Sequence, residues 1–242
     1  DLRGGGVQEA SFDISRGEIL GITGLSGSGF EDVPYLLFGV AKAESGSLGV
    51  DETIDLPTLN PGRAFHAGMA LVPADRQRDG AILSLSVLDN VSMQVLRRFQ
   101  TGLFLNRRRL RAESRAVLGR FDVRPADPDL NCSSLSGGNQ QKVLMAKWLQ
   151  TRPTLMLVHE PTQGVDIGAR EEIFDVLRKA AAEGMSILCA SSDHEQLASL
   201  CDRVLVFSRG RIIAELTGDD IDKEAISELC YAAPSAANRS AS

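Results

Sequence analysis

The sequence predicts an α/β fold with a mostly parallel sheet, and three observations support this prediction. Apolar runs of strand length alternate with helical patterns along the chain, which is typical of strands joined by crossover helices. The first of these runs leads directly into a glycine-rich turn. From about residue 84 to 149 the strand signals vanish and helical periodicity takes over. We therefore expect an α/β core, about residues 1–83 and 150–233, interrupted by an α-helical subdomain over about residues 84–149.

The individual elements are predicted from apolar runs and from periodicity. Short apolar runs predict strands at residues 18–23, 47–50, 70–73, 154–158, 186–190, 203–207 and 211–215. Helical patterns are found at residues 30–38, 63–69, 143–149, 169–182 and 221–231. Residues 234–242 are small and polar, and we expect them to form a disordered tail.

Length and composition indicate an ordinary globular protein. The 242 residues suffice for one large domain or two small ones, and 43% of them are hydrophobic. Asp and Glu outnumber Lys and Arg by 32 to 26, and the resulting net charge of −6 argues against a surface built to hold nucleic acid. No apolar run approaches the roughly 18 residues of a membrane-spanning helix. Because the chain begins with Asp1 and no leader follows, we interpret it as a piece of a longer polypeptide.

The spacing of the cysteines, histidines and arginines favours structural roles for these residues. The four cysteines lack CxxC spacing and the three histidines form no spaced cluster, so we expect buried thiols in a reducing compartment and no metal site. Eight arginines between residues 97 and 120 indicate either a patch for nucleic acid or acidic lipid, or a solvated helix face. The solvated face is favoured because the rest of the chain is acidic, and we predict no nucleic-acid partner.

A candidate phosphate-binding loop follows the first predicted strand and precedes a predicted helix. Residues 24–29 (GLSGSG) match the first six positions of GxxxxGK[ST], a motif whose glycines let backbone amides turn toward an anion. The next two positions hold Phe30 and Glu31 in place of Lys and Ser or Thr. Phe30 offers phosphate neither charge nor donor, and the Glu31 carboxylate would repel it. The candidate nucleotide-binding residues of this loop are Gly24, Ser26, Gly27, Ser28 and Gly29.

A second candidate anion site lies at residues 135–142 (LSGGNQQK), just ahead of a predicted helix. This run resembles the LSGGQ signature of the ATP-binding-cassette (ABC) ATPases, and its continuation to residue 149 resembles the sugar-importer branch. Residues 72–80 (VPADRQRDG) are similar to a further motif of that branch, and the details resemble its second, C-terminal cassette. The resemblance covers about residues 17–213. It implies a P-loop NTPase core with a small antiparallel β portion at the N-terminus.

Carried over by position, the resemblance implies a nucleotide site that has lost much of its chemistry. The family's phosphate lysine, Mg²⁺ hydroxyl, Q-loop glutamine, Mg²⁺-binding aspartate and switch histidine are replaced here by Phe30, Glu31, Ala74, His159 and Ser192. A neutral imidazole does not replace a hard anionic oxygen ligand for Mg²⁺. The general-base position is kept as Glu160. Because the other groups of the site are replaced, we interpret Glu160 as a relic or as an ordinary acidic residue at a helix start.

The groups that face a partner cassette are retained. In this family two cassettes hold ATP between them, and each site joins one cassette's phosphate loop to the other's signature. The retained groups are Ser136, Gly137 and Gly138 of the signature and Asp166 of the D-loop. We therefore predict that this chain contributes its signature to ATP and Mg²⁺ held by an upstream cassette of the same polypeptide. Its own site is expected to bind ATP and Mg²⁺ weakly or not at all, and its ATPase activity alone is expected to be absent or very weak.

The resemblance also implies partners and a location. It implies membrane permease subunits and, indirectly, a sugar-binding protein, with the chain attached peripherally to the cytoplasmic face of the cell membrane. A groove near residues 74–80 would meet the permease. Three alternatives remain: a cassette that hydrolyses ATP unaided, an ABC scaffold without a transporter, and a nucleic-acid-linked ABC protein. An upstream intact cassette would argue against the scaffold, and a salt-sensitive affinity for nucleic acid would support the last alternative.

Overall fold

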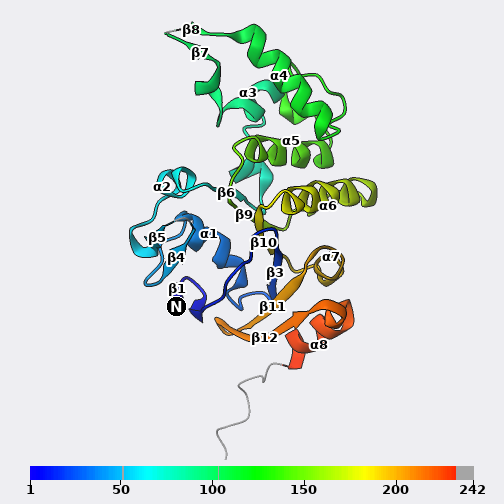
Figure 1. Ribbon diagram of the computed structural model, residues 1–242. Coiled ribbons are helices and arrows are strands. Elements are labelled where there is room, and N and C mark those ends of the chain that lie inside the picture. Colours follow the sequence, from blue (N-terminus) through cyan, green and yellow to red (C-terminus); the bar gives the residue numbers. More distant parts are fainter. Residues whose placement is uncertain (51, 103, 233–242) are drawn as a thin grey trace, which may run out of the picture.

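The centre of the molecule is a mixed sheet (Figure 1). Within residues 1–50, 52–102 and 104–232, which the computed structural model describes, eight strands lie in the order β1-β2-β12-β11-β3-β10-β9-β6. Their bounds are β1 Leu2–Gly4, β2 Val7–Ala10, β3 Ile19–Gly24, β6 Met69–Val72, β9 Leu155–His159, β10 Ser186–Ala190, β11 Arg203–Ser208 and β12 Arg211–Thr217. The neighbours from β11 to β6 are parallel, whereas β1 with β2 and β11 with β12 are antiparallel. The predicted α/β class, with a mostly parallel sheet and an antiparallel portion at the N-terminus, is confirmed.

Alternating side chains of the parallel strands build two cores, one on each face of the sheet. Along β9, Leu155 and Leu157 join one apolar cluster, while Met156 and Val158 join the other. The first cluster is covered by α1 (Val33–Phe38) and α2 (Pro61–His66). The second is covered by α5, α6, α7 and α8, which span Gly137–Leu149, Ile167–Ala182, His194–Leu200 and Lys223–Ala232. Strands buried on both faces read as continuous apolar runs, which is why the sequence located them well.

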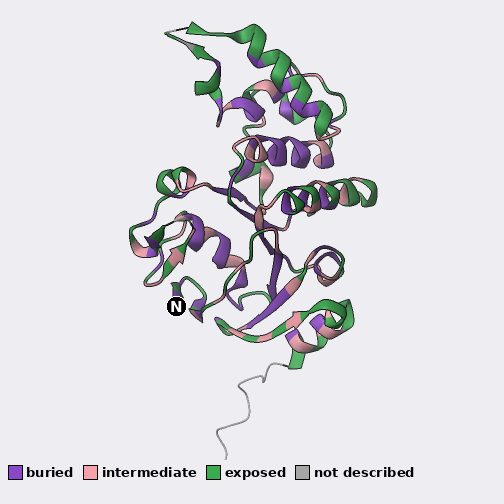
Figure 2. Cartoon of the chain, viewed as in Figure 1, coloured by how far each residue is buried: buried purple, intermediate pink, exposed green. Residues whose placement is uncertain are grey.

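A separate helical unit lies at one end of the molecule, between β6 and β9 in sequence (Figure 1). It consists of α3 (Val87–Ser92), α4 (Arg107–Arg120) and α5, and Figure 2 shows that their buried sides face each other. Val91, Leu118 and Val143, one from each helix, belong to the same buried apolar cluster. The limits 84 and 149 of the subdomain stay a prediction, and the predicted tail at 234–242 lies outside the described residues.

We expected no strands in this helical region, and this prediction is wrong at one place. β7 (Gln100–Thr101) and β8 (Phe104–Leu105) form an antiparallel hairpin. Strands of two residues are too short to produce a period-two pattern, so the sequence carries no signal for them. A second small hairpin, β4 (Ser47–Gly49) with β5 (Thr53–Asp55), includes a strand that was not predicted.

Some helix bounds also differ from the prediction for identifiable reasons. The helix expected at 63–69 begins at Pro61 and ends at His66, because Asn60 caps it and Pro61 occupies its first turn. The helix expected from residue 30 starts as a 3₁₀ turn, Phe30–Asp32, before α1. In the described part of the chain, no helix has both the length and the apolar character that crossing a membrane requires.

Candidate functional site

Three parallel strands end side by side, and candidate groups follow each of them directly. β10 lies between β3 and β9, and Ala190 near its end is paired with Ile22 of β3 and His159 of β9. In open α/β sheets, ligands bind outside the carboxyl ends of the parallel strands. The fold therefore brings the phosphate loop (residues 24–29), Glu160 and Ser191 to the same edge of the sheet.

The phosphate loop has the expected left-handed glycines, but one of its amides is already occupied. Gly29 has a φ of 101°, and a Cβ there would lie only 2.6 Å from the carbonyl oxygen of Gly6, so glycine is required. The N–H of Gly27 donates to Oε1 of Glu31 at 2.9 Å. Beside it, Asp32 Oδ2 accepts the N–H of Gly6 at 2.6 Å. The Glu31 carboxylate thus occupies an amide of the phosphate loop, whereas Asp32 binds the turn between β1 and β2.

Aromatic groups fill the interior behind the loop. Phe30 is 2% exposed, and its ring lies edge-on to His159 with centroids 6.4 Å apart. Oη of Tyr35 lies 3.0 Å from Nδ1 of His159 and accepts the N–H of Ala74 at 3.3 Å. Burial lowers the pKa of His159 below its ordinary value, although Glu160 and Glu31 act in the opposite direction. The imidazole is therefore neutral at physiological pH and engaged by Tyr35.

Glu160, the candidate general base, is tied to the end of β10. Its Oε2 accepts the hydroxyl of Ser191 at 2.8 Å. Its Oε1 accepts both the N–H and the hydroxyl of Ser192, at 2.6 and 2.7 Å. The backbone of Glu160 has a φ of 48°, an uncommon conformation for a residue with a side chain. The expected positions of the general base and of the switch histidine are therefore adjacent, and the serine there holds the carboxylate.

The signature forms the first turn of a long helix. α5 begins at Gly137, not at residue 143 as predicted, because Ser136 caps it: its Oγ accepts from the N and Nδ2 of Asn139, at 3.4 and 2.9 Å. Two glycines and an asparagine have low helix propensity, and no apolar period begins before Val143, so sequence patterns place the start too late. Ser136 itself is exposed, whereas Gly138 is buried.

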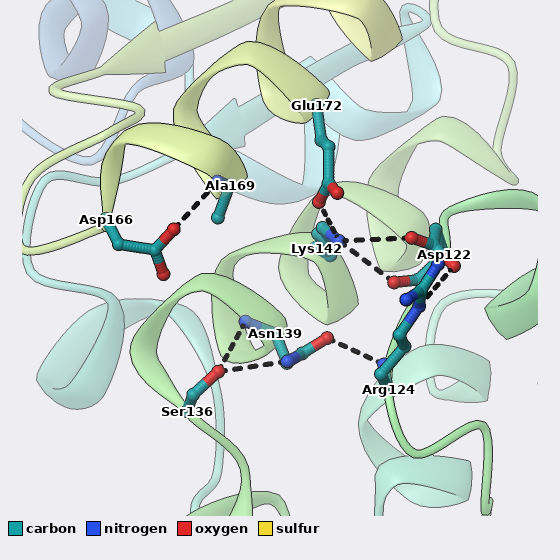
Figure 3. A network of polar contacts seen from close by, with 8 residues as sticks. All are labelled: Asp122, Arg124, Ser136, Asn139, Lys142, Asp166, Ala169 and Glu172. Carbon is teal, nitrogen blue, oxygen red and sulfur yellow. Dashed lines mark hydrogen bonds and ion pairs between the residues drawn. The ribbon is translucent and has the colours of Figure 1, made fainter.

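A network of polar contacts supports the signature from behind (Figure 3). Asn139 Oδ1 accepts the N–H of Arg124 at 2.7 Å, and Arg124 pairs with Asp122. Nζ of Lys142, whose side chain is 6% exposed, donates to the carbonyl of Asp122 at 2.9 Å and forms an ion pair with Glu172. These contacts anchor α5 to α6 and to the segment after α4. The first turn of the signature helix is thereby held in place.

The D-loop lies against the signature glycines. Asp166 caps α6 by accepting the N–H of Ala169 at 3.0 Å (Figure 3). A Cβ on Gly138 would lie 2.8 Å from the Cβ of Ala169 and 3.4 Å from Cγ1 of Val165, so glycine permits this close approach. Gly138 therefore lies beside Asp166, since a Cβ on Gly138 would be 3.9 Å from Oδ2 of Asp166. Their role at an interface with a partner cassette stays a prediction. The phosphate loop is elsewhere: α1 behind it packs on the opposite face of the sheet from α5.

Sequence reasoning missed two side chains that shape these sites. Tyr35, which contacts His159, sits in a predicted helix, and nothing in its spacing marks it. Arg76 donates to the carbonyl oxygens of Gln163 and Gly164, at the start of the D-loop (residues 164–166). The signal for Arg76 was its place in the run at residues 72–80 that resembles an importer motif.

Comparison with known proteins identifies the family to which this chain belongs. The family model described as "ABC transporter" matches residues 7–163, well over half of the chain. The ribose import ATP-binding protein RbsA of Chelativorans sp. (strain BNC1) is 42% identical over 221 residues, covering 90% of this chain and 43% of that protein. The protein of the same name from Cereibacter sphaeroides is 40% identical over 233 residues, covering 96% and 45%. The chain thus spans less than half the length of these curated relatives.

Solved structures support the fold. A crystal structure of a nucleotide-free ATP-binding cassette from an ABC transporter superposes with a TM-score of 0.78, covering 93% of this chain and 92% of that one. The two sequences are only 21% identical, so this likeness concerns the fold alone.

Proposed function

The chain belongs to the ABC transporter family, and from this premise we propose that it is the ATP-binding cassette of a carbohydrate importer. We propose further that it acts by lending its signature to ATP bound by a partner cassette, since its own phosphate site is degenerate. One observation carries this proposal: the phosphate loop is occupied by its own Glu31, whereas the Ser136 end of the signature helix is exposed and supported.

The contact between Glu31 and Gly27 opposes nucleotide binding in two ways. It uses a backbone N–H of the turn that would otherwise point at a phosphate oxygen. It also places a carboxylate where the polyphosphate would lie, and two like charges in such proximity cost several kcal/mol. Phe30, buried behind the loop, supplies no compensating cation.

The residues at this edge do not fit Mg²⁺. The ion prefers hard oxygen ligands in octahedral geometry, and the positions of its expected ligands hold Glu31 and His159. Glu31 is already an acceptor for Gly27, and the buried imidazole lies against Tyr35. We therefore assign no hydrolytic step to this cassette's own site, and Glu160 is retained there without the groups it would act with.

The signature side fits the opposite role. Ser136 caps α5, so the helix N-terminus, with its partial positive charge and its Ser-Gly-Gly sequence, has the chemistry of an anion site. Across the interface, the partner's phosphate loop would hold ATP and Mg²⁺, and the metal would neutralise phosphate charge there. This chain's share is to close over the phosphates with Ser136, Gly137 and Gly138, with Asp166 beside them.

The names of the relatives support a proposal for the transported solute and the partners. Two relatives are named ribose import proteins, and a third is named for ribose, galactose and methyl galactoside import in Pseudomonas fluorescens. We propose a similar small sugar for this chain, with an upstream cassette in the same polypeptide and permease subunits at the cytoplasmic face of the membrane. A sugar-binding protein would deliver the sugar to that permease. Residues 74–80 of this chain would contact the permease.

The test introduces a large charged side chain at the signature, in the polypeptide that carries both cassettes, and measures ATPase activity. Ser136→Arg should abolish its ATPase activity, because a bulky side chain blocks closure over the partner's ATP. Ser227→Arg is the matched control, since Ser227 lies on α8 at the other end of the molecule in Figure 1 and should leave turnover unchanged. Unchanged turnover in Ser136→Arg, with both variants folded, would refute the composite site.

A further inference from the structure

The segment that follows β6 presents two arginines in different directions. Asp75 starts a single turn at Arg76–Gly80 by accepting the N–H groups of Gln77 and Arg78, at 3.1 and 3.0 Å. Arg78 points outward: its side chain is 81% exposed, and its Nε pairs with Oδ1 of Asp79 at 3.5 Å. Arg76 turns inward and is half-buried. The turn thus separates two chemically identical side chains that are two residues apart.

Arg76 joins this segment to the D-loop. Its Nη1 donates to the carbonyl of Gln163, and its Nη2 donates to the carbonyl of Gly164 at 3.4 Å. Its Nε is buried and makes no hydrogen bond, so the guanidinium is anchored through its two terminal nitrogens. Two neighbouring carbonyl oxygens are a good match for the planar fork of arginine, and the single ammonium of lysine reaches only one at a time.

The same guanidinium lies against the signature. A Cβ on Gly137 would lie 2.6 Å from Nη2 of Arg76 and 3.0 Å from the carbonyl oxygen of Gly164. Gly137 therefore leaves the space that Arg76 occupies. The loop after β6, the loop after β9 and the start of α5 therefore meet at the side chain of Arg76.

The far end of the turn is tied to the signature helix by a second cation. Nζ of Lys147 on α5 donates to the carbonyl of Gly80 at 3.0 Å, in a buried position. A methyl group of Leu144 would lie 2.7 Å from a Cβ on Gly80, which shows how closely the turn approaches α5. The turn is consequently held at Gly80 by the signature helix and at Arg76 by the D-loop.

From this geometry we propose that Arg76 is a positioning residue for the composite ATP site. It sets the spacing between the signature glycines and the D-loop, and it makes that spacing follow any movement of the turn at residues 76–80. The inference rests on the proposed function, because it concerns the face that closes over the partner's ATP. Arg76 itself touches no nucleotide in this scheme.

The experiment compares Arg76→Ala, Arg76→Lys and the control Arg108→Ala in the polypeptide that carries both cassettes. Measured are kcat and KM for ATP, per folded protein, and the midpoint of thermal unfolding. We expect Arg76→Ala to lower kcat about tenfold or more while KM changes less than threefold, because the partner's phosphate loop still holds ATP. Arg76→Lys should retain an intermediate kcat. Arg108→Ala, at an exposed position of α4 away from residues 74–80, should stay within twofold of the unmodified protein.

The outcomes separate this inference from the proposed function. A kcat of Arg76→Ala within twofold of that of Arg108→Ala overturns the positioning role, as does a lowered melting midpoint with normal kcat per folded protein. If Arg76→Ala does not fold, Arg76→Lys decides: an intermediate kcat supports the role and an unchanged kcat overturns it. If Ser136→Arg is inactive but Arg76→Ala is normal, only this inference fails. If Ser136→Arg is fully active, the composite site fails as well.

Discussion

Two glycine-rich helix starts in this molecule have opposite relations to the rest of the chain. At residues 24–31 the loop turns onto itself: Glu31 accepts the N–H of Gly27, and Phe30 is buried behind it. At residues 135–142 the start of α5 keeps Ser136 exposed, and its supporting contacts come from the side away from the surface. Both segments have the backbone chemistry of an anion site.

A helix N-terminus is open to a ligand anion only where the chain does not place a carboxylate of its own on the same amides. At the phosphate loop Glu31 is such a carboxylate, since it accepts the N–H of Gly27. At the signature, Asp122 and Glu172 pair with Lys142 behind the helix, and Asp166, which lies beside Gly138, caps α6 and not α5. Four measurements test this contrast, beginning with the one for which we expect the largest change.

Truncating the buried ring of Phe30, which directly follows the phosphate loop, tests whether this segment packs into the core. Phe30→Ala should lower the free energy of unfolding by about 3–5 kcal/mol, since it removes a fully buried ring and leaves a cavity. Leu25→Ala, at a position 44% exposed in the same loop, should change it by less than about 0.5 kcal/mol. Denaturant titrations of both variants measure the effect, and equal losses would contradict a loop packed into the core.

Restoring the motif residues tests whether the loop's own groups exclude ATP. Calorimetric titration should give millimolar or no binding of ATP to the unmodified chain, with or without Mg²⁺. The variant Phe30→Lys/Glu31→Ser/His159→Asp should gain about 100-fold in affinity, or roughly 2.7 kcal/mol, because it supplies a cation and frees the amide of Gly27. Ser136→Arg in the same chain should leave ATP binding unaltered. Micromolar, Mg²⁺-dependent binding by the unmodified chain would favour the alternative of an active cassette.

Removing the buried cation tests the support behind the signature. Lys142→Met should lower the free energy of unfolding by about 2 kcal/mol, because a charged hydrogen bond at a buried site is lost. Lys223→Met provides the control: its pair with Glu195 is exposed and 3.6 Å long, and such pairs contribute about 0.5 kcal/mol or less. Similar losses in the two variants would show that Lys142 does not brace α5.

The smallest expected effect is a pH dependence that involves His159. Burial lowers its pKa in the folded state, so the unfolded chain binds more protons between that pKa and the ordinary value of about 6.5. Stability should therefore rise with pH across this window and be lost as pH falls through it. In His159→Gln, which does not titrate, the decline in unfolding free energy from pH 7.5 to pH 5 should be smaller. An identical decline in both proteins would mean that the imidazole is not held in its neutral form.

Spacing and period determined much of this protein from the sequence. The buried parallel strands were predicted within a residue or two because both their faces are apolar. The phosphate loop and Glu160 could be assigned to one edge because motif order and strand direction fix where those residues emerge. The two-residue strands of the β7–β8 hairpin and the glycine start of α5 escaped prediction, since short or low-propensity segments give no periodic signal.

Tertiary structure alone decided what occupies each site. His159 and Tyr35 are 124 residues apart in sequence, and Arg76 and Gly164 are 88 apart. No local pattern encodes such contacts, because they depend on how strands are ordered and which face each helix covers. Even the hydrogen bond that Gly27 donates to Glu31, four residues further along the chain, depends on the left-handed glycines that turn the loop back. The sequence thus specified which groups are present and at which end of the sheet, while packing decided which of them a ligand could still reach.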